Sequence, residues 1–148
     1  MNYWERLETL KINSIERRLE RYRVIYVWKI MEGLVPNCGV KSHTSERIGR
    51  MCEIPPLNKK STMRMQTLRE KSFNINGPML FNSLPKKIRN LSKCSIEDFK
   101  TQLDMYLDKI PDQPKVTNLV PVACNQVTAK PSNSLIDQVR RLNINAGG

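Results

Sequence analysis

One stretch decides how this chain folds: residues 72–89 read SFNINGPMLFNSLPKKIR. Gly77-Pro78 indicates the start of a helix, because proline suits the first helical turn, where its missing N–H costs nothing. Pro85 should then break the segment into two short helical turns. Apolar residues that recur at helical spacing form the predicted buried stripe, Leu80, Phe81, Leu84 and Ile88. The cations that this arrangement leaves on the solvent side are Lys86, Lys87 and Arg89.

Two helices are predicted upstream of this stretch. Apolar residues at helical spacing indicate a first helix that ends near Ile12. Asn13 or Ser14 caps a second helix, which we expect to run to about Glu32, where Gly33 ends it. Its first half should point Ile15, Leu19 and Tyr22 inward and Arg17, Arg18, Arg21 and Arg23 outward. Its second half, residues 24–28, is apolar on nearly every side, so later segments or another domain must cover it.

A basic β-hairpin is predicted between these helical regions. Residues 36–48 are typical of a loop, and the best strand candidates are Arg50–Ile54 and Met65–Ile75, joined by the turn-rich residues 55–60. Side chains alternate along a strand, so one face of the second strand would carry Arg69, Lys71, Phe73 and Ile75. The basic end of that face could contact phosphate or could simply be solvated.

The remaining sequence predicts one more helix and a tail. Ser95 caps a helix, with Asp98 at the capping-box position, and Pro111 ends it. Its predicted inner face comprises Ile96, Phe99, Leu103, Tyr106, Leu107 and Ile110. Apolar residues thin out from Asp112, which predicts a flexible tail with a possible short helix at 134–142. We therefore expect an α+β fold that is mainly α, with one small domain over residues 1–111 and a tail over residues 112–148.

The sequence favours an intracellular protein that contacts no membrane. No apolar run approaches the roughly 20 residues that a membrane-spanning helix requires. The N-terminus lacks the apolar segment of a signal peptide. Four cysteines without a Cys-x-x-Cys pair fit reduced thiols better than a disulfide framework. The expected location is therefore nuclear or cytoplasmic.

Candidate catalytic and metal-binding groups are few. Cys38, His43 and Cys52 lack the spacing and the fourth ligand of a zinc site. Asp104 and Asp108 share one helical face, a pattern that a solvated surface explains better than a metal site does. The sequence also contains neither a glycine-rich phosphate loop nor a nucleophile with a nearby histidine motif. We therefore expect no enzyme activity, no metal and no cofactor.

Positive charge is concentrated in the middle of the chain. The formal net charge is +11, and residues 41–93 contain 12 Lys and Arg against 3 Asp and Glu. A field of one sign confined to a third of a chain attracts polyanions, of which nucleic acid is the commonest. A basic surface that serves solubility, or that faces an acidic protein, stays an alternative.

Four blocks of this sequence also match one family in the same order. Residues 72–89 fit the pattern S-F-x3-G-P-x-L-F-N-S-L-P-x2-I-R, and residues 47–55 fit R-x-G-R-x-C-x-I-P. Residues 10–37, with YVWKIMEGLVPN at their end, precede them, and residues 99–112 follow. Together they resemble the segment that follows the reverse transcriptase domain in non-LTR retrotransposon polyproteins of the jockey/CR1 kind. The resemblance covers roughly Leu7 to Pro114.

The resemblance implies a non-catalytic part of a protein that copies element RNA into DNA, since the catalytic residues of that family lie upstream. The chain would hold the RNA or DNA phosphate backbone and could contact an upstream polymerase domain. The candidate nucleic-acid-binding residues are Arg47, Arg50, Lys59, Lys60, Arg64, Arg69, Lys71, Lys86, Lys87 and Arg89. The alternatives are a structural or protein-interaction module and a retroelement remnant without function. Exposed apolar surface would favour the interaction module.

Overall fold

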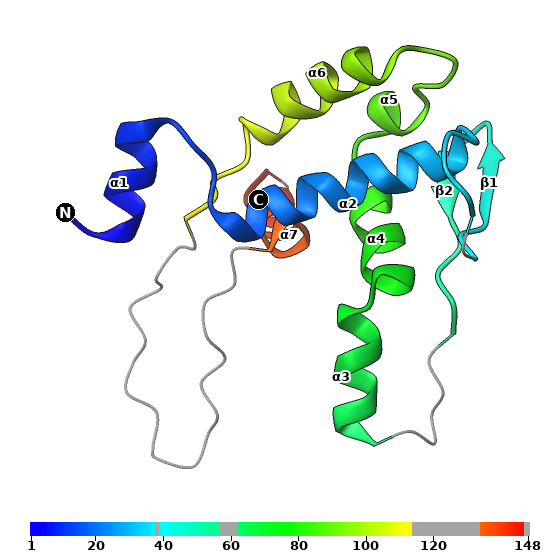
Figure 1. The fold of residues 1–148 in the computed structure, drawn as a ribbon, viewed down its shortest axis with the longest axis horizontal. Helices are drawn as coiled ribbons and strands as arrows, with labels where there is room; N and C mark the ends of the chain where they lie inside the picture. Colours follow the sequence, from blue (N-terminus) through cyan, green and yellow to red (C-terminus); the bar gives the residue numbers. More distant parts are fainter. Residues whose placement is uncertain (38, 57–61, 114–133, 147–148) are drawn as a thin grey trace.

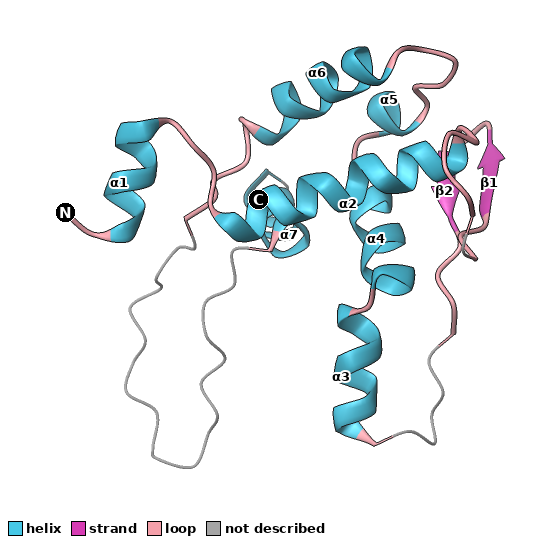
Figure 2. Ribbon diagram, in the orientation of Figure 1, coloured by secondary structure: helices cyan, strands magenta, loops and turns pink. Residues whose placement is uncertain are grey.

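A computed structural model describes residues 1–37, 39–56, 62–113 and 134–146 (Figure 1). Within these residues the fold is mainly helical, with one two-stranded antiparallel sheet (Figure 2). This confirms the predicted fold class. The elements are α1 (Tyr3–Leu10), α2 (Ile15–Met31), β1 (Ser42–Ser45), β2 (Gly49–Cys52), α3 (Met63–Lys71), α4 (Phe73–Asn82), α5 (Lys86–Arg89), α6 (Ile96–Leu107) and α7 (Leu135–Ala146).

Helices α1 and α2 form where their end signals predict. The side chain of Ser14 accepts a hydrogen bond from the backbone N–H of Arg17 and so caps α2. Gly33 follows the other end of α2 with a φ of +74°, a conformation that glycine adopts without strain. Helix α2 runs along the length of the molecule, with the hairpin at its C-terminal end and α1 and α7 near its N-terminal end (Figure 1).

The core forms around the second half of α2, and later segments of this chain cover it. Val24, Val27 and Trp28 are fully buried. The Trp28 ring stacks on Phe99 of α6, with ring centroids 4.6 Å apart and planes 11° apart. Helix α4 packs on α2 through Gly77, where a Cβ atom would lie only 3.0 Å from a Val27 methyl carbon. Glycine at this position therefore permits the close approach of the two helices.

The first half of α2 differs from the prediction at four residues, whereas Arg18 is exposed as predicted. Ile15, Leu19 and Tyr22 are exposed, whereas Arg17 is only 1% exposed. The reason is that polar partners on the C-terminal segment hold Arg17 inside: its guanidinium donates hydrogen bonds to the carbonyls of Ile110 and Pro111. A buried arginine whose donors are satisfied by such acceptors can occupy a position that an apolar side chain would otherwise fill. The spacing of hydrophobic residues cannot predict such a substitution.

The predicted strand over residues 65–75 is wrong, because this segment is helical. Thr62 caps α3 by accepting a hydrogen bond from the backbone N–H of Met65. The Met, Gln, Leu, Arg, Glu and Lys residues that follow all favour helix. Ser72, in an extended conformation, ends α3 and begins α4. Arg69, Lys71, Phe73 and Ile75 therefore do not share a strand face.

Helix α4 also begins earlier than Gly77-Pro78, which lies inside the helix and not at its start. Pro78 removes the hydrogen bond to the carbonyl of Asn74 one turn earlier, and Asn74 is exposed to solvent. Pro78 itself is buried, so its ring contributes apolar contacts in exchange. The predicted break at Pro85 and the predicted burial of Leu80, Phe81, Leu84 and Ile88 are both confirmed.

The hairpin lies N-terminal to its predicted position. Strand β2 overlaps the predicted strand over residues 50–54, but its partner is β1, within the segment predicted to be loop. Ser42 pairs with Cys52 and Ser45 pairs with Gly49, so three residues form the turn. Gly49 has a φ of +73°, and a Cβ atom there would lie 2.5 Å from Oδ1 of Asn90. Only glycine satisfies both conditions.

The C-terminal helices complete the core. Ser95 caps α6 as predicted, and Phe99, Leu103, Leu107 and Ile110 are buried. Helix α7 overlaps the short helix predicted at 134–142, and its first residue, Leu135, is fully buried. The Glu20 carboxylate accepts a hydrogen bond from the Leu135 backbone N–H, at 2.7 Å. The predicted division at residues 111 and 112 stays a prediction, and residues 114–133 lie outside the described residues.

Replacing Phe81 by alanine should destabilise the fold by about 3–5 kcal/mol, because the fully buried ring leaves a cavity that close-packed neighbours cannot fill. The control is Met105→Ala, since Met105 is 55% exposed and its loss should change stability by less than about 0.5 kcal/mol. Urea denaturation of both variants and the parent measures the difference. Equal stability of Phe81→Ala and the parent would contradict the packing of α4.

Glu20 should make stability depend on pH. Burial raises the pKa of Glu20 above 4.5 in the folded chain, although Leu135 and Arg17 oppose the shift. A raised pKa stabilises the fold fully below pH 4.5, and this contribution is lost as the pH rises through the folded pKa. Glu20→Gln keeps an oxygen acceptor for Leu135 but does not titrate. The parent should therefore gain stability relative to the variant as the pH falls from 7 to 4.5, as urea denaturation can measure; parallel pH profiles would contradict this.

Candidate nucleic-acid interface

The candidate site is built around strand β2. Side chains of the 72–89 stretch, and that of Asn90 directly after it, hold this strand in place. The Asn82 amide brackets Cys52: it accepts from the Cys52 N–H at 2.8 Å and donates to the Cys52 carbonyl at 2.9 Å. Asn90 accepts from the Arg50 N–H at 2.9 Å. Arg89 donates to the Arg50 carbonyl at 3.0 Å. Three side chains thus satisfy backbone groups of one short strand, which positions the Arg50 side chain.

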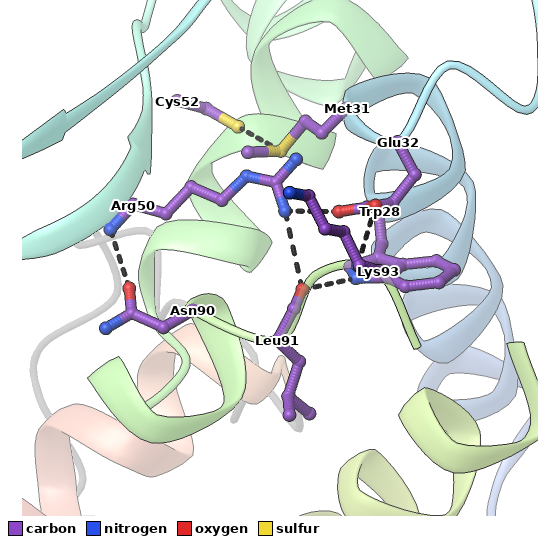
Figure 3. A network of polar contacts seen from close by, with 8 residues as sticks. All are labelled: Trp28, Met31, Glu32, Arg50, Cys52, Asn90, Leu91 and Lys93. Carbon is purple, nitrogen blue, oxygen red and sulfur yellow. Dashed lines mark hydrogen bonds and ion pairs between the residues drawn. The ribbon is translucent and has the colours of Figure 1, made fainter. Parts of the chain in front are cut away.

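The Arg50 guanidinium belongs to a network of hydrogen bonds at the end of α2 (Figure 3). It donates to the Glu32 carboxylate at 2.6 Å and to the Leu91 carbonyl at 3.4 Å. The Leu91 carbonyl also accepts from the Trp28 indole N–H at 2.9 Å, and the other Glu32 oxygen accepts from the Lys93 backbone N–H. Both ion-pair side chains are only 14% exposed. Arg50 is therefore committed to contacts within the chain.

Arg89 is also committed within the chain, which corrects its predicted solvent-facing position. It is 9% exposed and donates to the carbonyls of Leu84 and Arg50. Burial lowers the pKa of the Arg89 guanidinium, and the two carbonyl acceptors compensate part of that cost. Lys86 and Lys87 are exposed, as predicted.

The Cys52 thiol is buried. Burial raises the pKa of its thiol to about 11, and Arg50 opposes the shift only in part. The thiol lies 3.5 Å from the Met31 sulfur, on the apolar side of the Arg50 network (Figure 3). A neutral thiol in such surroundings behaves as a small apolar side chain.

A polar groove of about 590 Å³ opens between the hairpin, the end of α2 and α5. Lys86 crosses it, with its ammonium 2.7 Å from the Glu46 carbonyl in the hairpin turn. The charged side chains that line it are Glu32, Glu46, Arg50, Lys86 and Lys93. Arg47 is exposed in the adjoining turn. The groove thus combines cations with hydroxyl and amide groups, a composition that suits phosphate oxygens.

A second set of candidate cations lies on α3, which extends away from the body beyond α4 (Figure 1). Arg64 and Lys71 are exposed, and Arg69 reaches the Pro56 carbonyl at 3.5 Å. Lys59 and Lys60 lie outside the described residues. The structure therefore gathers Arg47, Arg50, Lys86, Lys87 and Arg89 around the hairpin and α5, and places Arg64, Arg69 and Lys71 on a separate helix.

Sequence reasoning did not include three residues of the groove and its support. Lys93 lines the groove and has a φ of +55° in the loop after α5. Asn82 and Asn90 fix the β2 backbone. A signal was available for the asparagines, because Asn82 belongs to the block that resembles the retrotransposon segment and Asn90 directly follows it.

Of the two aspartates that share a face of α6, Asp108 is exposed and Asp104 has a partner of its own. Arg21 donates two hydrogen bonds to Asp104, at 2.6 and 3.1 Å. Asp112 accepts from the Ser14 hydroxyl at 2.7 Å. In the described part of the chain no three His, Cys, Asp or Glu side chains cluster as metal ligands would. His43 is exposed on β1, and Cys38 lies outside the described residues.

Comparison with protein-family models, with curated proteins and with solved structures finds no match. None of the described helices has both the length and the apolar composition that crossing a bilayer requires.

Arg50→Ala should destabilise the fold, whereas Lys87→Ala should not. Removing the Arg50 guanidinium leaves the half-enclosed Glu32 carboxylate without its charged donor, at a cost of about 2–3 kcal/mol. Lys87 is exposed, so its loss should cost less than about 0.5 kcal/mol. Thermal and urea unfolding of the two variants, which lose the same charge, measures the contrast. Similar stabilities would show that the Arg50 network contributes nothing to folding.

Proposed function

We propose that this chain is a non-catalytic, nucleic-acid-binding segment of a non-LTR retrotransposon reverse transcriptase protein. The blocks of sequence that resemble such proteins support this, because residues 28–32, 49–52 and 82–90 converge on one network around Arg50. Three of the four separated blocks thus contribute to one network. It preserves the mutual positions of α2, β2 and α5.

The observation that carries the binding proposal is the exposed positive charge around the hairpin and α5. Arg47, Lys87 and Lys93 are exposed there, and no ion pair of theirs occurs among the described residues. Lys86 also keeps its ammonium at the surface, beside the hairpin turn. These cations lie in the hairpin turn, on α5 and in the loop that follows α5. Contacts from them to phosphates would position a nucleic acid without reading its sequence.

The binding should tolerate different sequences. Base-specific contacts need donors and acceptors held toward base edges, but the groups available here are mainly flexible ammonium groups. Among the described residues that line the groove none is aromatic, so stacking of bases contributes little there. Glu32 and Glu46 also line the groove, and Glu32 already neutralises Arg50. A phosphate is therefore favoured at the rim of the groove over its interior.

A protein-interaction module is the second candidate function. The observation in its favour is an exposed apolar stripe along α2, formed by Ile15, Leu19, Tyr22 and Tyr26. The two functions can coexist, since the stripe spans residues 15–26 of α2 and the groove is lined by Met31 and Glu32 at the C-terminal end of that helix.

Binding should be weak and salt-dependent. We expect dissociation constants on the order of 1–100 µM for unrelated RNA and DNA oligonucleotides near physiological salt. The triple variant Arg47→Ala/Lys87→Ala/Lys93→Ala should lower the slope of log affinity against log salt by up to about 0.9 per lost contact on duplex DNA, or about 0.7 on single strands. Fluorescence anisotropy at several salt concentrations measures both quantities.

The matched control is Arg6→Ala/Lys11→Ala/Lys109→Ala, which removes three exposed cations outside the basic segment. It changes the net charge equally but should retain most of the salt slope. Equal loss in both variants would assign the effect to net charge and would contradict a site at the hairpin. Affinity for one sequence alone would contradict backbone recognition.

A further inference from the structure

Helix α2 carries an apolar stripe that faces away from the core. Ile15, Leu19, Tyr22 and Tyr26 are 58%, 50%, 62% and 41% exposed. Their spacings of four, three and four residues place them in one row along the helix, the spacing at which one helix packs against another. The buried residues Arg17, Val24 and Trp28 occupy the other side. Helix α2 thus has two packing faces, of which this chain's core uses one.

The tyrosines of the stripe are already held in place. The Tyr26 ring meets Phe73 of α4 edge to face, with centroids 5.3 Å apart. The Arg21 guanidinium lies over the Tyr22 ring, 5.9 Å from its centroid. Rings fixed in this way lose little conformational freedom when a partner covers them, which favours association.

We propose that this stripe pairs with the same stripe of a second copy of the chain, with the two α2 helices antiparallel. Charge complementarity selects this occupant and this orientation. Glu16 and Arg23 flank the stripe on one side, seven residues apart, and Arg18 flanks it on the other. Antiparallel pairing brings Glu16 of each copy near Arg23 of the other, whereas parallel pairing brings Arg18 near Arg23 twice.

The apolar layers fit the same orientation. Antiparallel pairing sets Ile15 opposite Tyr26 and Leu19 opposite Tyr22, so each layer contains one aliphatic and one aromatic side chain. Parallel pairing would instead place two tyrosines in each of two layers. Layers of equal size pack at uniform helix separation, and the tyrosine hydroxyls can reach solvent at the edges.

The dimer should dissociate on dilution. A stable specific interface buries about 800 Å² per partner, which is more than four half-exposed side chains present. Flanking charged side chains must supply the rest of the contact, and exposed ion pairs add only about 0.2–1 kcal/mol each. The association is therefore concentration- and salt-dependent, and it does not depend on nucleic-acid binding.

Sedimentation velocity of the full chain over a hundredfold concentration range tests the proposal. The parent should change from monomer to dimer as its concentration rises through this range. Leu19→Asp should remain monomeric at concentrations at least tenfold above those at which the parent dimerises. The matched control is Met105→Asp, because Met105 is 55% exposed on α6 and lies off the stripe. It should dimerise like the parent. A monomeric parent, or equal effects of the two aspartates, would overturn the proposal.

Charge reversal tests the orientation. Glu16→Arg leaves only cations on that flank and Arg23→Glu leaves only acids, so each variant alone should be monomeric. An equimolar mixture should restore the dimer, because opposite flanks then meet. Circular dichroism confirms that each variant keeps its helices, which matters for Arg23 since it also donates to Asn76. A mixture that stays monomeric, or single variants that dimerise, would exclude antiparallel pairing.

Discussion

The Trp28 side chain is the point on which the rest of the structure depends. Its ring is fully buried and stacks on Phe99, which fixes α6 to α2. Its indole N–H donates to the Leu91 carbonyl, which also accepts from Arg50. One side chain therefore joins α2, α6 and, through a shared acceptor, strand β2. A two-stranded hairpin is marginal in water by itself, so this attachment is what allows it to form.

The predictable part of the fold is the part that local signals determine. Ser14, Gly33, Ser95 and Pro85 mark helix ends through backbone chemistry that acts over a few residues, and each marks an end in the structure. The hairpin and α3 differ from the prediction because the turn-forming residues 55–60 suggest a hairpin connection there, while the cap at Thr62 and strong helix formers make residues 63–71 helical. Which face of α2 is buried depends on distant carbonyls at Ile110 and Pro111, which no local pattern contains.

The candidate site was predictable as a region but not residue by residue. Charge counting located the basic segment, and Lys86 and Lys87 are exposed in it. It could not separate them from Arg50 and Arg89, whose guanidinium groups donate to Glu32, Leu84, Leu91 and the β2 backbone. Arginine and lysine count equally in a formal charge, yet arginine's planar set of donors suits it to internal acceptors. The same difference explains why the exposed groove cations are mostly lysines.

The small fraction of apolar residues in the chain explains why arginines are buried inside the fold. Only 39% of the residues are hydrophobic, so apolar burial alone leaves gaps between elements that short segments must bridge. Arg17, Arg50 and Arg89 each reach carbonyl groups on another segment, which ties chain ends and loops that have few apolar residues. Arginines that are hydrogen-bonded within the chain in this way are not available to bind a polyanion. The net charge of +11 therefore overstates the binding surface, and the binding surface is better measured by the ammonium groups that remain at the hairpin and α5.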